Sequence, residues 1–281
     1  MLADNRKGPL CMFAASICWS FGGLFIKLIP WSAMSIIGLR ALLAALVFII
    51  YRKSARVRFT GGNVLGAICL STTITLFVFA NKLTTAAAAI LLQFTAPVFI
   101  ILIELVCYRK KPTPAGIIAV AVTLLGMLLF FADRLESGSL LGNLLAIASG
   151  LFFAGVFVCN NRPDVNPEHS LLLGFLICSV IGMPFAFFEV TADPLAWGAT
   201  ILLGVVQVGL AYVFFSIGIK RTAALLACLI TAMEPVLNPV WVALVTKEVP
   251  GPFTVAGGAV ILITVVCYNI WVEKYQNAQK T

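Results

Sequence analysis

Long runs of apolar residues, separated by short polar segments, follow one another along almost the whole chain. A helix that crosses a bilayer needs about 20 mainly apolar residues, and each run is about that long. In lipid the backbone has to satisfy its hydrogen bonds within the segment, so each run is predicted to be an α-helix. Ten spans are predicted, at residues 9–28, 33–51, 63–80, 86–108, 115–132, 140–159, 170–188, 197–219, 223–245 and 253–271.

The positions that interrupt these runs repeat at a constant offset of 138 residues, as from Thr84 to Thr222. The repeat predicts two units of five spans, at residues 1–136 and 137–281. Because five is odd, the second unit must cross the membrane in the opposite direction to the first, which is typical of secondary transporters. The other matching pairs are Lys82 and Lys220, Leu91 and Leu229, Pro97 and Pro235, Pro112 and Pro250, and Pro114 and Pro252.

The basic residues fall mainly on one side of this predicted topology. With the N-terminus in the cytoplasm, the inner loops and tails hold 14 of the 19 lysines and arginines. The outer loops hold Lys27, Lys82, Arg134 and Lys247, and Arg40 lies inside a span. Cytoplasmic loops carry an excess of positive charge, so an even number of spans with both termini in the cytoplasm is predicted.

Composition excludes several classes of function. The chain is 61% apolar and 11% charged, whereas soluble proteins carry about 25% charged residues. The net charge of +8 sits in short loops between spans, so we expect no nucleic-acid partner. No nucleotide-binding loop or hydrolase motif is present, and the eight cysteines are scattered through apolar runs. We therefore expect no cofactor, no metal and no enzymatic activity.

Several short segments, taken together, resemble a known family. The chain resembles the drug/metabolite transporter superfamily, in particular its EamA-type ten-helix exporters, over nearly its whole length. Two departures separate its halves: Ala96 stands opposite Glu234, and Lys110 opposite Glu248. The matching segments are Trp19-Ser20-Phe21-Gly22, Leu39-Arg40, the alanine-rich run before Pro97, Glu234-Pro235-Val236, and Glu248 nine residues before Gly257.

The resemblance implies a basket of ten helices around a central cavity, lined mainly by the first, third, fourth, sixth, eighth and ninth spans. Relatives move amino acids, nucleobases, quaternary amines and other small metabolites, often outward. The aromatic and neutral amino-acid exporters are the most similar type. The resemblance also implies a multi-pass protein of a bacterial-type cytoplasmic membrane, acting as a monomer or homodimer.

Glu234 is the candidate with the clearest physical argument. It lies about eleven residues into the ninth span, where a charged side chain costs about 2.5 to 3.5 kcal/mol. It must therefore face a cavity or partner, or stay protonated. Thr231 and Asn238 lie at i−3 and i+4 on the same helical face, so the three form one polar stripe. Glu234 is predicted to bind a substrate ammonium group or a coupling proton; the alternative is a structural anchor beside Pro235.

Other polar, aromatic and proline residues complete the predicted site. Gln93 is the repeat partner of Thr231 and either contacts substrate or bridges two helices. Pro97, Pro235 and Pro239 are predicted to kink their spans and act as hinges. Arg40 is predicted to form a structural ion pair with an acid such as Glu104, or to pair with carbonyls, and so to orient its span; contact with substrate is the alternative. The predicted aromatic wall consists of Trp19, Phe79, Phe153 and Tyr212, with Phe157 and Phe215 as further candidates.

The sequence thus favours a secondary transporter of small organic solutes, driven by a solute or proton gradient and working by alternating access. Amino-acid efflux is the leading prediction. Quaternary amines or nucleobases are the alternatives within the same fold. A membrane receptor or scaffold without transport activity is the alternative from another class.

Overall fold

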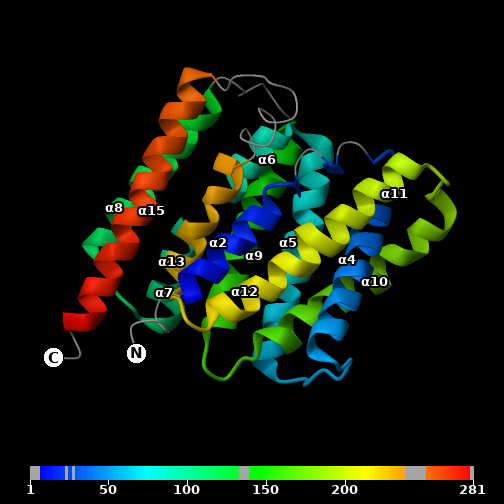
Figure 1. Cartoon of the computed structure of the whole chain (residues 1–281), viewed down its shortest axis with the longest axis horizontal. Coiled ribbons are helices and arrows are strands. Elements are labelled where there is room, and N and C mark those ends of the chain that lie inside the picture. The colour runs from blue at the N-terminus through cyan, green and yellow to red at the C-terminus, as the bar shows by residue number, and fades with distance from the viewer. Residues whose placement is uncertain (1–6, 23–24, 27–28, 133–138, 238–250, 279–281) are drawn as a thin grey trace.

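The computed structural model describes residues 7–22, 25–26, 29–132, 139–237 and 251–278, and within them the chain is helical without a β-strand (Figure 1). The first half contains α2 (Lys7–Trp19), α4 (Ala33–Arg52), α5 (Gly61–Leu83), α6 (Ala86–Gln93), α7 (Ala96–Tyr108) and α8 (Pro114–Phe131). The second half contains α9 (Leu140–Asn161), α10 (Pro167–Glu189), α11 (Pro194–Ile201), the π-helix η2 (Leu202–Leu210), α12 (Ala211–Ile219), α13 (Ala224–Thr231) and α15 (Pro252–Ala278).

The predicted all-helical, multi-pass membrane architecture is confirmed. In the described residues, eight helical stretches are long and apolar enough to cross a membrane. One of them joins α6 to α7, and another joins α11, η2 and α12. A shorter apolar helix covers Ala224–Leu237, and α2 covers the described part of the first predicted span. The end of the ninth predicted span, from residue 238, lies outside the described residues.

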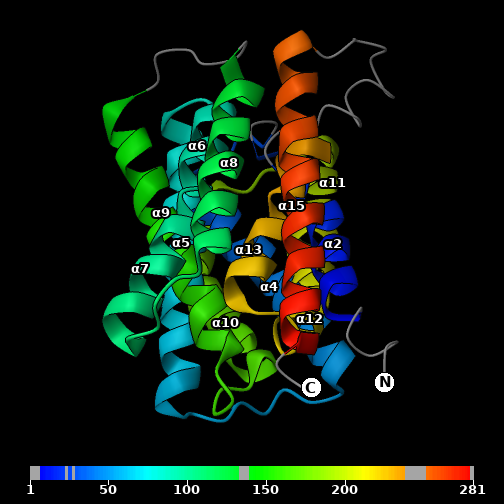
Figure 2. The same cartoon turned by 90° about the vertical axis from the view of Figure 1, so that its left-hand side faces the viewer.

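Helix packing follows the inverted repeat. Helix α5 of the first half packs against α9 of the second. The symmetry-related pair, α12 of the second half and α2 of the first, packs in the same way. The corresponding helices α8 and α15 pack against each other. Figure 2 shows them side by side and running in opposite directions, with the end of α8 beside the start of α15. Corresponding helices therefore cross the membrane in opposite senses, as the odd number of spans per unit requires.

Two lysines at equivalent repeat positions show the inversion at single-residue level. Lys82, near the end of α5, donates from Nζ to the carbonyl of Ile29 at 2.8 Å. Lys220, after α12, donates to the carbonyls of Arg162 and Val165 between α9 and α10. Each lysine thus closes a loop that leads into the second helix of a unit, and the two loops lie at opposite ends of the molecule.

Two glycines allow the central helices to pack in close contact. Gly38 in α4 and Gly182 in α10 face each other where these helices cross. A Cβ added at Gly38 would lie 2.4 Å from the carbonyl carbon of Gly182. No side chain fits there, so α4 and α10 meet backbone to backbone. Small residues permit such contacts between helices in membranes.

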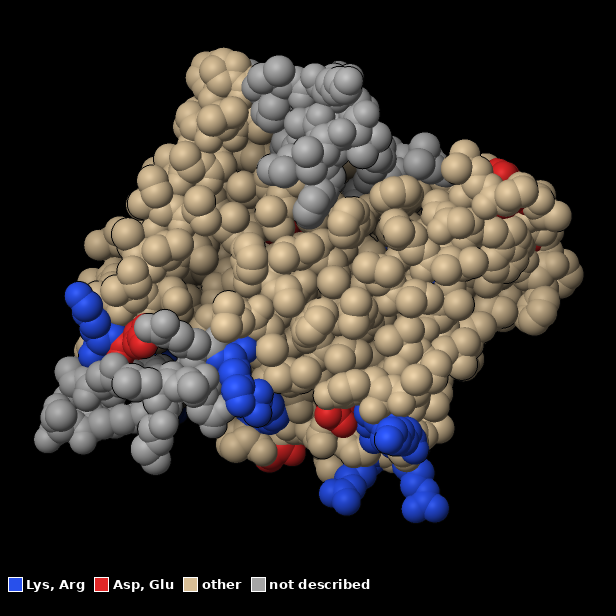
Figure 3. Space-filling model, viewed as in Figure 1, with Lys and Arg blue, Asp and Glu red and all other residues tan. Residues whose placement is uncertain are grey.

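The outer surface is suited to lipid. Large apolar side chains on several helices are mostly exposed, including Val106, Val180 and Phe188. In Figure 3 the basic side chains in view gather at one end of the molecule, and the face above them is almost free of charge. An uncharged apolar belt with basic residues at one end is the pattern expected of a protein that spans a bilayer.

Candidate functional site

Two helices break at equivalent positions close to the centre of the fold. Helix α6 ends at Gln93 and α7 begins at Ala96, with Pro97 in its first turn. In the other half α13 ends at Thr231, and residues 233–237 resume a helix that contains Pro235. Each proline lacks an N–H and crowds the carbonyl four residues earlier, which belongs to Gln93 or Thr231. The predicted kinks at Pro97 and Pro235 are therefore present, while Pro239 lies outside the described residues.

A small cavity of about 40 Å³ lies between these breaks and the helices around them. A water molecule needs about 10 to 15 Å³ in this measure, so the cavity holds a few waters and no organic solute. The described residues that line the cavity are Trp19, Arg40, Thr73, Ile74, Phe77, Gln93, Phe153, Gln207, Val208, Tyr212 and Glu234.

Aromatic rings form one wall of the cavity. The ring of Trp19 meets Tyr212 edge to face, with centroids 5.0 Å apart, and meets Phe153 at 6.0 Å. Phe157 and Phe215 are fully buried behind these rings and do not line the cavity. Edge-to-face contacts hold the rings in fixed orientations. The wall is thus preorganised for an apolar or aromatic group.

Arg40 projects into the cavity from α4 and is only 4% exposed. Its Nη2 donates to Oε1 of Gln207 at 3.3 Å, while Nε and Nη1 have no hydrogen-bond partner in the described structure. The predicted ion pair of Arg40 with Glu104 is wrong. Glu104 instead pairs with Lys110 at 3.3 Å, near the exposed end of α7. The reason is depth, because Arg40 lies in the interior of its span and Glu104 lies close to the end of α7.

Gln207, the partner of Arg40, belongs to the π-helix η2. Such wider turns are rare and are frequent at functional sites. Its amide lies against Gly22, where an added Cβ would be 2.6 Å from Nε2. The glycine of the Trp19-to-Gly22 segment therefore leaves room for the amide that holds Arg40.

Glu234 provides the only acidic side chain among the described residues that line the cavity, and Arg40 the only basic one. Glu234 lies just after the break that follows α13. Its repeat partner Ala96 is fully buried at the start of α7. The two broken helices are thus alike in backbone and different in charge.

The structure brings together most, but not all, of the predicted site. Gln93 lines the cavity and donates from Nε2 to the hydroxyl of Ser149 at 3.1 Å. Thr231 does not line it, because its buried hydroxyl donates to the carbonyl of Cys228 at 2.6 Å. Phe79 does not line it either, and Phe77 occupies that wall instead. Asn238 lies outside the described residues.

Sequence reasoning missed Thr73, Ile74, Phe77, Gln207 and Val208. Only Gln207 carried a usable signal, as an amide in the middle of an apolar span. Its repeat partner is Cys69, which carries no amide, so the repeat does not mark Gln207 as a site residue. The others are ordinary residues of membrane helices, and their place at the cavity depends on how the helices rotate.

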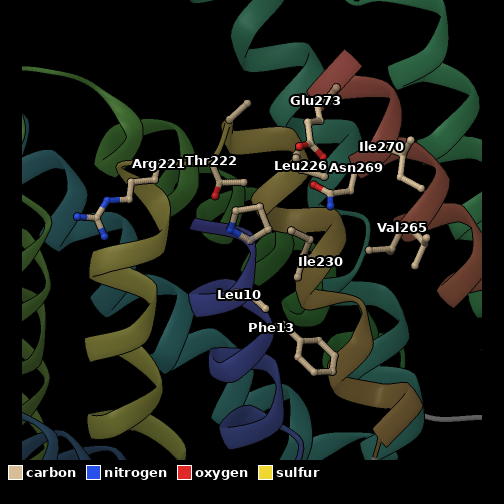
Figure 4. A pocket seen from close by; sticks show the side chains of 14 residues that line it. Leu10, Phe13, Arg221, Thr222, Leu226, Ile230, Val265, Asn269, Ile270 and Glu273 are labelled. Carbon is tan, nitrogen blue, oxygen red and sulfur yellow. The ribbon is translucent and has the colours of Figure 1, made fainter. Parts of the chain in front are cut away.

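A second, larger hollow of about 580 Å³ opens on the side of the molecule between α2, α13 and α15. Figure 4 shows Leu10 and Phe13 from α2, Ile230 from α13 and Val265 from α15 around it. Its few polar groups, among them Arg221 and Glu273, stand near the start of α13 and the end of α15. Mainly apolar walls suit this groove to lipid contact rather than to selective recognition of a polar solute.

Inverted repeats, broken helices and a cavity between them define the architecture of a membrane transporter. The chain belongs to the EamA-like transporter family, whose model matches it twice, over residues 6–132 and 140–270. The resemblance inferred from the sequence is therefore confirmed. The exact boundary predicted between residues 136 and 137 stays a prediction.

Two curated relatives are the pseudopaline exporter CntI from two strains of Pseudomonas aeruginosa. Each is 26% identical to this chain over 185 residues, which is 64% of this chain and 64% of the relative. The match thus spans under two thirds of the relative's length. A crystal structure with 20% sequence identity superposes with a TM-score of 0.81, covering 96% of this chain and 99% of the other. At that identity the likeness concerns the fold alone.

Proposed function

We propose that the protein is a secondary transporter that exports small organic solutes across the cytoplasmic membrane by alternating access. The observation that carries this proposal is the small cavity at the meeting point of two symmetry-related broken helices, with one acid and an aromatic wall among the described residues. Two inverted halves can exchange the roles of inner and outer gate around such a site.

We propose an amino acid or a related metabolite as the solute. The edge-to-face rings of Trp19, Phe153 and Tyr212 suit an apolar or aromatic side chain, and Glu234 suits an ammonium group or a coupling proton. The relatives in Pseudomonas aeruginosa are exporters, which supports outward flux. Quaternary amines and nucleobases are the alternatives. A quaternary amine is a cation that suits aromatic rings, and a nucleobase has a flat ring with a polar edge.

The proposed orientation places both termini in the cytoplasm. Support comes from the basic side chains that gather at one end of the molecule (Figure 3). The loops after α4 and α7 carry the exposed Lys53 and Lys110. Lysine and arginine near the ends of spans favour the cytoplasmic side. The proposal includes a monomer or homodimer as the transporting unit, since both halves of the cavity come from one chain.

Solute exchange in proteoliposomes tests this function. Vesicles loaded with unlabelled L-phenylalanine or L-leucine should take up the labelled amino acid from outside, in a saturable manner and without ATP. Glu234→Gln should lower the initial rate at least about tenfold, because a charge-assisted contact is lost. Glu104→Gln is the matched control, since it removes an acid that lies away from the cavity, and it should exchange like the wild type.

Equal exchange by the wild type and Glu234→Gln would remove this residue from the site. Absence of exchange over a panel of amino acids, amines and nucleobases, in vesicles that contain folded protein, would contradict the transporter proposal itself.

A further inference from the structure

The guanidinium of Arg40 is buried with most of its hydrogen-bonding capacity unused. The residue is 4% exposed within a membrane-spanning helix, and only Nη2 has a partner among the described residues. That partner is the neutral amide of Gln207. Charged groups inside a membrane normally pair with an opposite charge or with several carbonyls, because they are costly to bury alone. Arg40 does neither.

Among the described residues, no acidic side chain forms an ion pair with Arg40. Glu104 pairs with Lys110. Glu234 lines the same cavity, yet no ion pair joins it to Arg40 in the described structure. The two unused nitrogens, Nε and Nη1, belong to a side chain that forms part of the cavity wall. The unused donors are therefore left for water or for a solute that enters the cavity.

The geometry of an arginine side chain selects the chemistry of that molecule. The planar guanidinium presents parallel N–H groups that match the two oxygens of a carboxylate. Gln207 holds one end of the guanidinium through Oε1, which limits its rotation. Gly22 leaves room for the amide of Gln207, because an added Cβ there would lie 2.6 Å from Nε2. The guanidinium of Arg40 is thus held in one orientation, with Nε and Nη1 unpaired among the described residues.

We propose that Arg40 binds the carboxylate of the transported solute and that Gln207 positions the guanidinium for this contact. The inference rests on the proposed function and narrows it to carboxylate-bearing solutes. Arg40 belongs to the first repeat unit and Glu234 to the second, so a zwitterion with an ammonium group at Glu234 contacts both halves.

The experiment compares three aromatic probes that share a similar body and differ in charge. L-Phenylalanine carries both charged groups, 3-phenylpropionate only the carboxylate, and phenethylamine only the ammonium. Binding to the purified protein is measured by thermal shift and by competition with labelled L-phenylalanine, at constant ionic strength. The wild type should bind all three, with L-phenylalanine the tightest.

The two charge variants should then show opposite selectivity. Arg40→Gln should weaken 3-phenylpropionate at least about tenfold and leave phenethylamine unchanged, because a charge-assisted pair is removed. Glu234→Gln should do the reverse. A merely structural role of Arg40 would lower stability and reduce the binding of all three probes alike, and that result would overturn the proposal.

A second variant keeps the test valid if Arg40→Gln fails to fold. Gln207→Glu is nearly isosteric and places a carboxylate within reach of Arg40. It should raise the melting temperature of the ligand-free protein and abolish the shift caused by 3-phenylpropionate. Retention of that shift would contradict the proposal.

Failure of this inference can be told apart from failure of the proposed function. If 3-phenylpropionate does not bind the wild type, the carboxylate site is wrong, whether or not phenethylamine binds. If phenethylamine still exchanges across the membrane, transport stands without the carboxylate site. If neither these probes nor the wider panel of amino acids, amines and nucleobases exchanges, the proposed function fails as well.

Discussion

Trp19, Gln93, Phe153, Tyr212 and Glu234 converge on one cavity although they are spread over most of the chain. Each could be singled out from the sequence because a polar or bulky aromatic side chain interrupts an apolar span. Their role in binding solute stays a prediction. What the structure adds is that the five meet at one place.

Other residues show why sequence alone was insufficient at this scale. Phe77 and Phe79 are two positions apart, or about 200° around a helix, so only one can face the cavity. Both are phenylalanines with the same hydrophobicity, so the sequence does not show which of them faces the cavity. The sequence predicts Thr231 and Glu234 on one helical face, which requires a continuous helix between them. The break at Ala232 separates the two faces, and Thr231 turns its hydroxyl to its own helix.

A pair of phenylalanines separates binding from stability. Phe153 lines the cavity and Phe157 packs behind it, with ring centroids 4.8 Å apart, and both are at least nine-tenths buried. Replacement of either by alanine should destabilise the protein by about 3 to 5 kcal/mol, since each leaves a hole. Only Phe153→Ala should also weaken L-phenylalanine binding in the thermal-shift and competition assays. Equal weakening by Phe157→Ala would contradict the assigned wall.

At the scale of helices, the hydropathy of the sequence predicts most transmembrane helices and their approximate ends. The span predicted at 33–51 is the helix Ala33–Arg52, and the one at 140–159 is Leu140–Asn161. Proline positions also predicted where the fourth and ninth spans are interrupted. The π-helix η2 was not predictable, because winding depends on packing against α4 and not on local composition.

Two prolines in different settings test whether the break in the ninth span has a function. Pro235 lies in the short helix after the break at Ala232, whereas Pro184 is exposed inside the intact helix α10. Pro235→Ala restores a donor for the carbonyl of Thr231 and should favour a continuous helix. We expect slower solute exchange, by about tenfold if the straight form is favoured by about 1.4 kcal/mol.

Pro184→Ala is the control for this substitution. It restores a helix hydrogen bond away from the cavity and should leave the exchange rate at the wild-type level. If both variants exchange like the wild type, the break in the ninth span is a packing feature and has no part in the transport cycle.

On the scale of the whole molecule, the repeat was the most informative property of the sequence. An offset shared by threonines, lysines and prolines, together with an odd number of spans per unit, predicted the inversion. The equivalent roles of Lys82 and Lys220 at opposite ends, and the antiparallel pair α8 and α15, follow from it. The small volume of the cavity did not follow, because symmetry predicts two open states and their interconversion but not which conformation is adopted.

The central claim is that one site between two inverted halves opens alternately to either side of the membrane. Thr73 lines the cavity and is 3% exposed, so it reports whether the cavity opens. The variant Thr73→Cys, with the native cysteines replaced, can be labelled by a membrane-impermeant thiol reagent from one side at a time. The account predicts slow labelling from both sides and a change in the ratio of the two rates when L-phenylalanine is present. Labelling from one side only, with or without solute, would contradict alternating access at this cavity.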